Sequence, residues 1–231
     1  MAGEMITLKG KDGSFGAYLA KPPGGTGPSV VCIQEIFGVN DWMRAIADDF
    51  AAAGFVALVP DLFWRIEPGI QINGEGEKEF GRAFGLYGKF NPDTGIQDVQ
   101  AAITHLRKMA GVNGKVGTTG YCLGGFLAYL SACRTDADAN VGYYGAGIDS
   151  KLDEAKAIRK PLMLHIATKD KFVAPDAQQR VRDGLKSNPH VTIHDYPEDH
   201  AFARKGGHSY VKASADTANT RTLDFFKKHL G

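Results

Sequence analysis

Residues 115–134 read KVGTTGYCLGGFLAYLSACR, and this stretch changes from a strand pattern to a helix pattern around one cysteine. It begins with β-branched residues and ends with small and apolar residues at helical spacing. Gly120 and Gly124 stand two positions before and two positions after Cys122. In a sharp strand-to-helix turn the central residue is exposed, and glycine fits best where strand and helix crowd each other. Because a helix N-terminus also favours a thiolate, the pattern predicts that Cys122 is a nucleophile.

The other two cysteines fit the usual role of an isolated cysteine, which is a small buried side chain. Cys32 lies inside an apolar strand pattern, and Cys133 lies near the end of a helical pattern. Three cysteines without paired spacing argue against a disulfide framework and indicate a reducing compartment. The first residues lack the apolar stretch of a signal peptide, so we expect a cytoplasmic protein.

The rest of the chain alternates short apolar strands with amphipathic helices. Such alternation predicts an α/β protein with a mostly parallel central sheet and helices on both faces, and we expect one domain over residues 1–231. The region 61–91 is rich in glycine, and we expect a loop there with one or two broken helices. We expect strands at 5–8, 15–20, 29–34, 55–60, 115–119, 141–144, 162–167 and 191–196, and helices at 40–53, 97–109, 123–133, within 151–158, at 175–186 and at 211–229.

Composition excludes several classes of function. The 231 residues carry a formal net charge of +1, so the sequence has no basic excess that would indicate a nucleic-acid or membrane surface. No stretch approaches the length of a membrane span. The sequence has neither an HExxH motif nor paired CxxC motifs, and the glycines near Cys122 lack the lysine of a phosphate-binding loop. We therefore expect no metal and no cofactor.

A cysteine nucleophile needs a base and a group that orients the base. In parallel sheets the active groups gather after the carboxyl ends of the strands. Asp170 follows the strand pattern at 162–167, and His200 follows the one at 191–196, in the chain order nucleophile, acid, histidine. Glu198 and Asp199 are weaker candidates for the acid because they precede His200 too closely. We predict Asp170 and His200 as the partners of Cys122.

The loop after the strand pattern at 29–34 reads QEIFG. This position supplies the second N–H of the oxyanion hole in folds of this kind, so we assign the two donors to the backbones of Ile36 and Leu123. Glu35 is unusual at the end of a buried strand. It is either a solvated loop carboxylate or a group that faces the thiol and controls its proton.

The sequence resembles the dienelactone hydrolases (carboxymethylenebutenolidases), a branch of the α/β-hydrolase fold that uses cysteine. The resemblance rests on QEIFGVN, VPDLF, NGKVGTTGYCLGG, VGYYG, KDKFV, HAFAR and RTLDF, which cover the chain almost end to end in the family's order. It implies a triad of Cys122, Asp170 and His200, with Glu35 holding the resting thiol. It also implies that Arg204 binds a substrate carboxylate, and that Phe37 and Tyr144 line the substrate site.

The sequence departs from the family pattern in the pocket. Phe80 and Phe84 stand where well-known members carry a second substrate arginine and a tyrosine, and Arg82 is nearby but out of register. Arg82 is either a substrate contact or an exposed helical side chain. Alanine replaces the usual serine in HAFAR. These differences leave the predicted triad intact, but they favour a more apolar or larger substrate.

These observations predict a hydrolase that opens an enol-lactone or cleaves a carboxylate-bearing ester through an acyl-enzyme on Cys122. The expected partner is an anionic small molecule, and the expected assembly is a monomer or a small homo-oligomer. A broad carboxylesterase for short or aryl esters is the first alternative. A non-catalytic α/β binding protein is a second. A thiol redox protein is disfavoured, because no second cysteine stands where it would resolve an oxidised Cys122.

Overall fold

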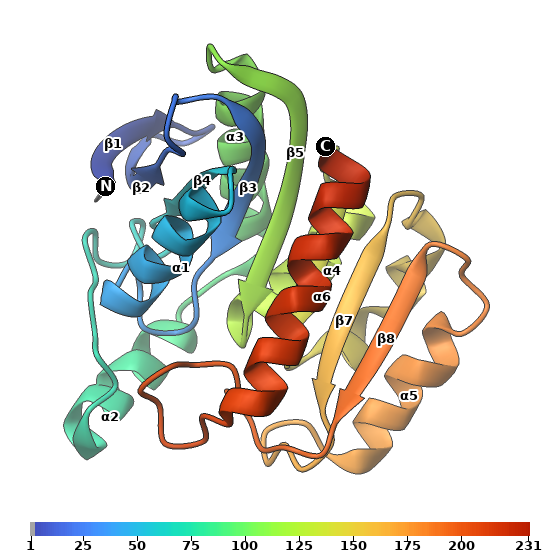
Figure 1. The fold of residues 1–231 in the computed structure, drawn as a ribbon. Helices are drawn as coiled ribbons and strands as arrows, with labels where there is room; N and C mark the ends of the chain where they lie inside the picture. Colours follow the sequence, from blue (N-terminus) through green and yellow to red (C-terminus); the bar gives the residue numbers. More distant parts are fainter. Residues whose placement is uncertain (1–2) are drawn as a thin grey trace. The chain divides into compact units, whose positions relative to one another are not determined.

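The computed structural model describes residues 3–231 (Figure 1). It divides into two compact units, residues 1–116 and 117–231. Both units are layers of strands and helices, as the alternating sequence pattern predicts. The expectation of one domain over residues 1–231 stays a prediction.

The first unit opens with the expected hairpin of β1 (Glu4–Lys9) and β2 (Ser14–Ala20), which pair antiparallel. Its strands lie in the order β1-β2-β4-β3, where β3 (Gly27–Ile33) and β4 (Val56–Pro60) are parallel and almost fully buried. Helix α1 (Asp41–Ala52) packs against β4 and β2, and its first turn is capped by the side chain of Asn40.

Two further helices complete the first unit. Region 61–91 contains α2 (Gly76–Tyr87), which confirms the expectation of a loop with a helix there. Helix α3 (Pro92–Lys108) begins five residues before the expected start at 97. Asn91 caps it, and a proline at the first position has no N–H to satisfy, so this start is favourable. The charged and polar residues of this first turn hide the helical period from a search for apolar spacing.

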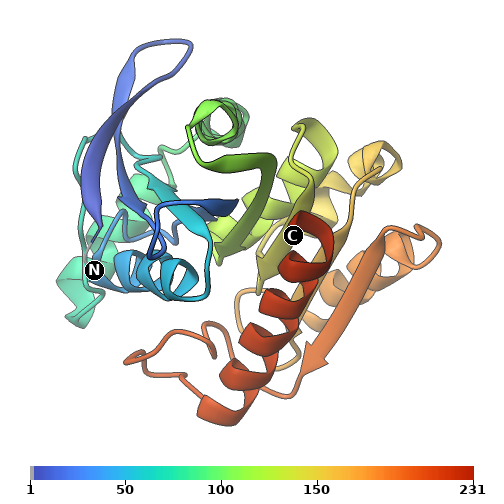
Figure 2. The same ribbon diagram turned by 45° about the horizontal axis from the view of Figure 1, so that its top comes forward.

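The second unit is a parallel sheet in the order β5-β6-β7-β8. Its strands are the end of β5 (Val112–Tyr121), β6 (Ala139–Tyr143), β7 (Leu162–Ala167) and β8 (Val191–Tyr196). Figures 1 and 2 show α4 (Leu123–Arg134) and α6 (Lys212–Leu230) on opposite faces of β6. The mostly parallel sheet with helices on both faces is therefore confirmed within this unit.

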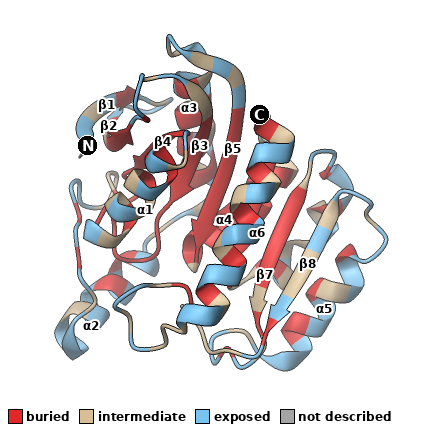
Figure 3. Ribbon diagram, in the orientation of Figure 1, coloured by how far each residue is buried: buried red, intermediate tan, exposed pale blue. Residues whose placement is uncertain are grey.

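Two shorter segments finish the second unit. Helix α5 (Pro175–Leu185) follows β7 and packs against η1 (Ile148–Ala157), which is a 3₁₀ helix where a helix within 151–158 was expected. Figure 3 shows β7 buried along most of its length, whereas one side of α5 faces solvent. The carboxyl ends of all four parallel strands lie at the same end of the sheet, because strands of a parallel sheet share a direction. Side chains that follow these strands are therefore gathered at that end.

Candidate active site

Cys122 occupies the turn between β5 and α4 with φ 57° and ψ −115°. L-residues other than glycine rarely adopt a positive φ, so the surrounding structure must hold this conformation. The Cys122 N–H donates to the carbonyl of Tyr143 at 3.1 Å, and the Cys122 carbonyl accepts from the N–H of Phe126 at 3.2 Å. The cysteine is thus fixed between the end of a strand and the first turn of a helix.

The glycines around Cys122 have the steric role that the sequence predicts. A Cβ added to Gly120 would lie 2.0 Å from the carbonyl oxygen of Gly124. A Cβ added to Gly125 would lie 2.2 Å from the carbonyl oxygen of Tyr143. Real Cβ atoms do not approach backbone oxygens so closely. Glycine at these positions lets α4 start directly against the sheet, which makes the sharp turn at Cys122 feasible.

The structure brings Asp170 and His200 together with Cys122. His200 Nδ1 lies 2.6 Å from Asp170 Oδ2, and the Asp170 side chain is 1% exposed. The His200 ring is also hydrogen-bonded to the side chain of Cys122. Burial alone would lower the pKa of His200, but the hydrogen bonds to Asp170 and Cys122 outweigh it and raise that pKa to about 10. The imidazole of His200 therefore lies between the carboxylate of Asp170 and the sulfur of Cys122.

Asp170 is oriented by its own loop. The N–H of Phe172 donates to Asp170 Oδ1 at 2.8 Å, which leaves Oδ2 for the imidazole. The Phe172 ring packs edge-on against His200 with 4.9 Å between ring centroids, and Tyr144 contacts the same ring at 5.1 Å. His200 is thus held between two aromatic rings, and these limit the directions in which it can turn. Phe172 belongs to the quoted motif KDKFV but was not among the predicted site residues.

Backbone strain is concentrated around this cluster. Over residues 3–231, the non-glycine residues with positive φ are Cys122 at 57°, Tyr144 at 38° and Ala201 at 63°. Cys122 directly follows β5, Tyr144 directly follows β6, and Ala201 directly follows His200. Such strain persists only where the surrounding contacts over-determine the backbone, and it is common at active sites. All three residues lie in loops that follow the carboxyl ends of strands in the second unit.

Two more predicted residues lie in the second unit. Leu123 is the first residue of α4 and is buried, so its N–H has no acceptor within the helix and can point to a charge at the turn. Arg204 is half-buried in the loop after His200, and its N–H donates to the carbonyl of Ala201 at 2.9 Å.

The remaining predicted residues lie in the first unit. Glu35, Ile36 and Phe37 lie in the loop that begins one residue after the end of β3, and all three are buried. A hydrogen bond from a distant segment fixes this loop, since the N–H of Ile72 donates to the Phe37 carbonyl at 2.9 Å. A Cβ on Gly38 would lie 2.0 Å from the carbonyl oxygen of Ile70, so glycine is needed here for the segment around Ile70 to pack against the loop.

Helix α2 carries the other predicted substrate contacts. Phe80 and Phe84 are 40% and 45% exposed, and the Phe80 ring packs edge-on against Phe37 at 5.5 Å. Arg82 is exposed and forms an ion pair with Glu67, which is also exposed. Arg82 thus has the exposed helical position that was one of its two readings. The two phenylalanines form an apolar strip on α2 at the positions where, by the resemblance, well-known family members carry an arginine and a tyrosine.

The surroundings of His165, Cys32 and Cys133 indicate structural roles for these residues. His165 is buried, and its two ring nitrogens lie 2.9 Å from the hydroxyl of Tyr196 and 3.0 Å from that of Thr222. Burial lowers the pKa of His165 well below its usual value. Burial raises the pKa of Cys32, and it raises that of Cys133 to about 11. These surroundings are consistent with the structural role expected for Cys32 and Cys133, and they give His165 a structural role as well.

The described residues, 3–231, contain no group of three or more His, Cys, Asp or Glu side chains arranged to hold a metal ion. No helix within the same residues combines the length and apolarity needed to cross a bilayer.

Comparison with known proteins identifies the class of this fold and site. The model of the dienelactone hydrolase family matches residues 15–230. A solved structure from Klebsiella pneumoniae, described as "Putative Dienelactone Hydrolase", superimposes with a TM-score of 0.87 at 25% identity and covers 98% of both chains. The protein is a hydrolase with the α/β-hydrolase fold, as its resemblance implied.

Curated relatives agree along nearly the whole chain. A protein of Azospirillum brasilense named "Putative carboxymethylenebutenolidase" is 48% identical over 225 residues, which are 96% of each chain. The carboxymethylenebutenolidase of Pseudomonas sp. strain P51 is 38% identical and aligns with 98% of this chain and 94% of its own length. This chain belongs to the dienelactone hydrolase family.

Proposed function

We propose that this chain hydrolyses enol-lactones, or esters that carry a carboxylate, through a covalent intermediate on Cys122. The observation that supports this most directly is the hydrogen-bonded series from Cys122 through His200 to Asp170 at the carboxyl edge of the sheet. A nucleophile, a base and a group that orients the base are what acyl transfer requires. The relatives named carboxymethylenebutenolidase favour an enol-lactone with a carboxymethylene substituent as the substrate.

The reaction follows from the chemistry of these groups. The sulfur of Cys122, with its proton held on His200, attacks the lactone carbonyl carbon. The negative charge that forms on the carbonyl oxygen is stabilised by the N–H groups of Leu123 and Ile36. The ring C–O bond then breaks, and the departing enolate takes up the proton that His200 received from Cys122 and becomes a ketone, which leaves His200 neutral. A water molecule attacks the thioester while His200 accepts its proton, and the thiol is restored as the acid product leaves.

A thiol suits this substrate class. Thiolates are good nucleophiles and good leaving groups, so they acylate well only when the competing leaving group is stable. The enolate of an enol-lactone is stable, whereas the amine of an amide is a poor leaving group. We therefore expect rapid opening of enol-lactones, slower hydrolysis of aryl esters and no hydrolysis of amides.

The other predicted residues have roles in the same proposal. Glu35 controls the proton of the resting Cys122 thiol, which a nearby carboxylate would keep neutral until substrate binds. Arg204 binds the substrate carboxylate, because its guanidinium can make two parallel hydrogen bonds to one carboxylate. Phe37 and Tyr144 line the site beside the reacting ring.

A second candidate function is a carboxylesterase with broad preference for short or aryl esters. The observation that favours it is the apolar strip of Phe80 and Phe84 on α2, both of them exposed. Aromatic side chains of this kind would bind an uncharged aryl group better than a second carboxylate. Under this alternative, the chemistry on Cys122 is the same and only the substrate preference differs.

The deciding experiment is a turnover panel that contains carboxymethylenebutenolide and uncharged aryl esters. Wild-type protein is compared with Arg204→Ala and with Lys205→Ala, an exposed neighbour of the same charge. The proposal expects preference for the anionic lactone and a KM for it that rises about 10- to 100-fold only in Arg204→Ala. Preference for uncharged esters, unchanged in Arg204→Ala, would instead support the carboxylesterase. No turnover of either substrate would contradict both.

A further inference from the structure

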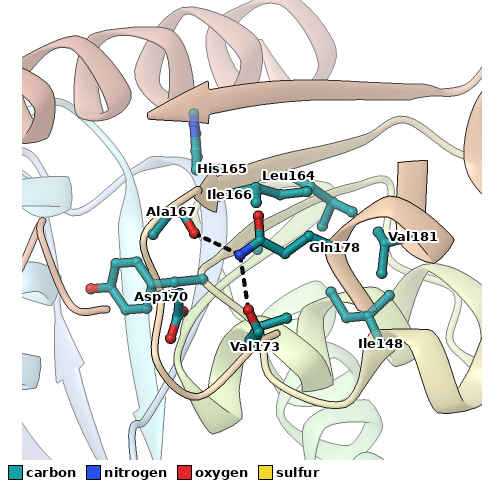
Figure 4. A pocket seen from close by; sticks show the side chains of 12 residues that line it. Ile148, Leu164, His165, Ile166, Ala167, Asp170, Val173, Gln178 and Val181 are labelled. Atoms are coloured by element: carbon teal, nitrogen blue, oxygen red, sulfur yellow. Dashed lines mark hydrogen bonds between the residues drawn. The ribbon is translucent and has the colours of Figure 1, made fainter. Parts of the chain in front are cut away.

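Gln178 on α5 is 3% exposed, and both ends of its side-chain amide are hydrogen-bonded. Its Nε2 donates to the carbonyl oxygen of Val173 at 2.9 Å and to that of Ala167 at 3.2 Å (Figure 4). Ala167 is the last residue of β7, and Val173 lies three residues beyond Asp170. One buried nitrogen therefore connects the two ends of the loop that carries Asp170.

The orientation of this amide is determined by its surroundings. Gln178 Oε1 accepts from Nη2 of Arg182 at 3.4 Å, and Arg182 pairs in turn with Asp195 on β8 at 2.8 Å. If the amide were turned over, its oxygen would face two carbonyl oxygens and its NH₂ would face a guanidinium. Both contacts would be repulsive, because carbonyls only accept hydrogen bonds and guanidinium only donates them. The Nε2 of Gln178 therefore donates to the loop and its Oε1 accepts from Arg182.

Packing alone does not hold the Asp170 loop on this side. A cavity of about 20 Å³, room for about one water molecule, is lined by Asp170, Val173 and Gln178 together with residues in or next to β6, η1, β7 and α5. Figure 4 shows the Gln178 amide spanning the space between α5 and the loop next to this cavity. Atoms beside a void lack contacts on that side, so directional hydrogen bonds must fix the loop there.

The position of the loop controls the geometry of the acid. The loop has only six residues between Ala167 and Ala174, and Asp170 receives one of its two hydrogen bonds from the loop's own Phe172 N–H. A shift of the loop therefore moves the carboxylate relative to His200, to which it is now bonded at 2.6 Å. A misplacement of 1 Å in a catalytic group can cost about 100-fold in rate.

We propose that Gln178 is a positioning residue that holds Asp170 in place for His200 by joining the two ends of its loop. The kinetic part of this inference rests on the proposed function, because Asp170 matters for the rate only if His200 is the base. Gln178 itself touches neither Cys122 nor His200 in the hydrogen bonds described. It acts only through the loop and Asp170.

The test replaces Gln178 with methionine, which has similar length and volume but cannot donate. The matched control is Gln179→Met on the same helix, where the side chain is exposed and bonds only to Asp183 at 3.1 Å. We expect Gln178→Met to lower kcat about 10-fold or more with KM within about twofold, while Gln179→Met leaves both unchanged. We also expect the pKa of His200, followed by NMR of its imidazole, to fall below the wild-type value only in Gln178→Met.

A second variant separates positioning from general stability. Gln178→Glu keeps the length of the side chain and the acceptor for Arg182 but has no N–H for the loop. If Gln178→Met fails to fold, the same losses in Gln178→Glu support the inference. Wild-type kcat and His200 pKa in a folded variant, even one with a lower melting temperature, overturn it. If the wild type hydrolyses neither substrate class, the proposed function fails. The inference about Gln178 is then tested by the His200 pKa alone. A pKa lower in the Gln178 variant than in wild type supports it, and an unchanged pKa overturns it.

Discussion

Asp170 and His200 meet at 2.6 Å because the strands that precede them are in parallel register. β7 and β8 pair from Leu162 with Val191 to Ala167 with Tyr196. The pairing continues beyond the strands, since the N–H groups of Thr168 and Lys169 donate to the carbonyls of Tyr196 and Glu198 at 2.8 and 2.9 Å. The two loops therefore leave the sheet side by side, and the carboxylate of one reaches the imidazole of the other.

Asp170→Asn tests the role of this pair. The asparagine amide keeps the size of the side chain but favours the wrong tautomer of His200 and removes the charge that stabilises the imidazolium. We expect kcat/KM for the lactone to fall about 1,000- to 10,000-fold. Asp176→Asn is the control, because Asp176 is an exposed carboxylate that pairs with Arg180 on the surface of α5. Steady-state kinetics that show equal activity in the two variants would rule out Asp170 as the orienting acid.

Burial of His165 makes the stability of the folded state depend on pH. Its pKa is lowered well below the ordinary value of about 6.5, with burial as the largest cause and the charges of His194 and Arg221 as further causes. Its neutral form is therefore required by the folded state. Stability from this residue is fully present above about pH 6.5 and is lost as pH falls below that value, because the unfolded chain takes up a proton first.

Urea unfolding at pH 7, 6 and 5 measures this effect. In wild-type protein we expect this residue to lower the free energy of unfolding by up to about 1.4 kcal/mol for each pH unit below 6.5. His165→Gln should flatten that part of the slope, whereas His190→Gln, at an exposed position, should not. His200 acts in the opposite sense, since its pKa is raised to about 10 and its contribution is lost between about pH 6.5 and 10. An identical slope in His165→Gln and wild type would contradict the assignment.

The turn at Cys122 makes a prediction about glycine. Gly120→Ala places a methyl group 2.0 Å from the Gly124 carbonyl oxygen, so the strand and helix must separate. We expect a loss of about 1–3 kcal/mol in the free energy of unfolding and a loss of activity in the protein that still folds. Gly81→Ala on α2 meets no atom within 4 Å and should instead stabilise the protein by about 0.5–1 kcal/mol. Thermal melts of both variants check this prediction. Equal melting temperatures of Gly120→Ala and Gly81→Ala would refute it.

Much of this arrangement follows from local sequence rules. Cys122 was identifiable because Gly120 and Gly124 mark a turn between a strand and a helix, and the structure gives the clash that makes them necessary. Asp170 and His200 were identifiable because each follows an apolar strand pattern. Parallel strands bring such positions to one edge, so their chain order was enough to group them.

Other features depend on contacts that no local pattern records. Gln178 reaches the Asp170 loop only because α5 packs back over it, and a glutamine in an amphipathic helix is otherwise an ordinary surface residue. Phe172 lies against His200 although it is 61% exposed, and its motif alone does not show that contact. The partners of His165 come from β8 and α6, which are distant in sequence. Tertiary packing, rather than periodicity, determines these three contacts.

The central claim is that the sulfur of Cys122 carries the acyl group. The most direct measurement is the rate of carboxymethylenebutenolide opening by wild type, Cys122→Ala and Cys133→Ala, with folding checked by circular dichroism. Mass spectrometry of protein quenched during turnover of a slowly deacylating aryl ester complements it. The account predicts an acyl adduct on the peptide that contains Cys122, activity in Cys133→Ala close to that of wild type, and a loss of at least about 1,000-fold in Cys122→Ala. Comparable turnover by folded Cys122→Ala, with no adduct on the wild-type cysteine, would contradict it.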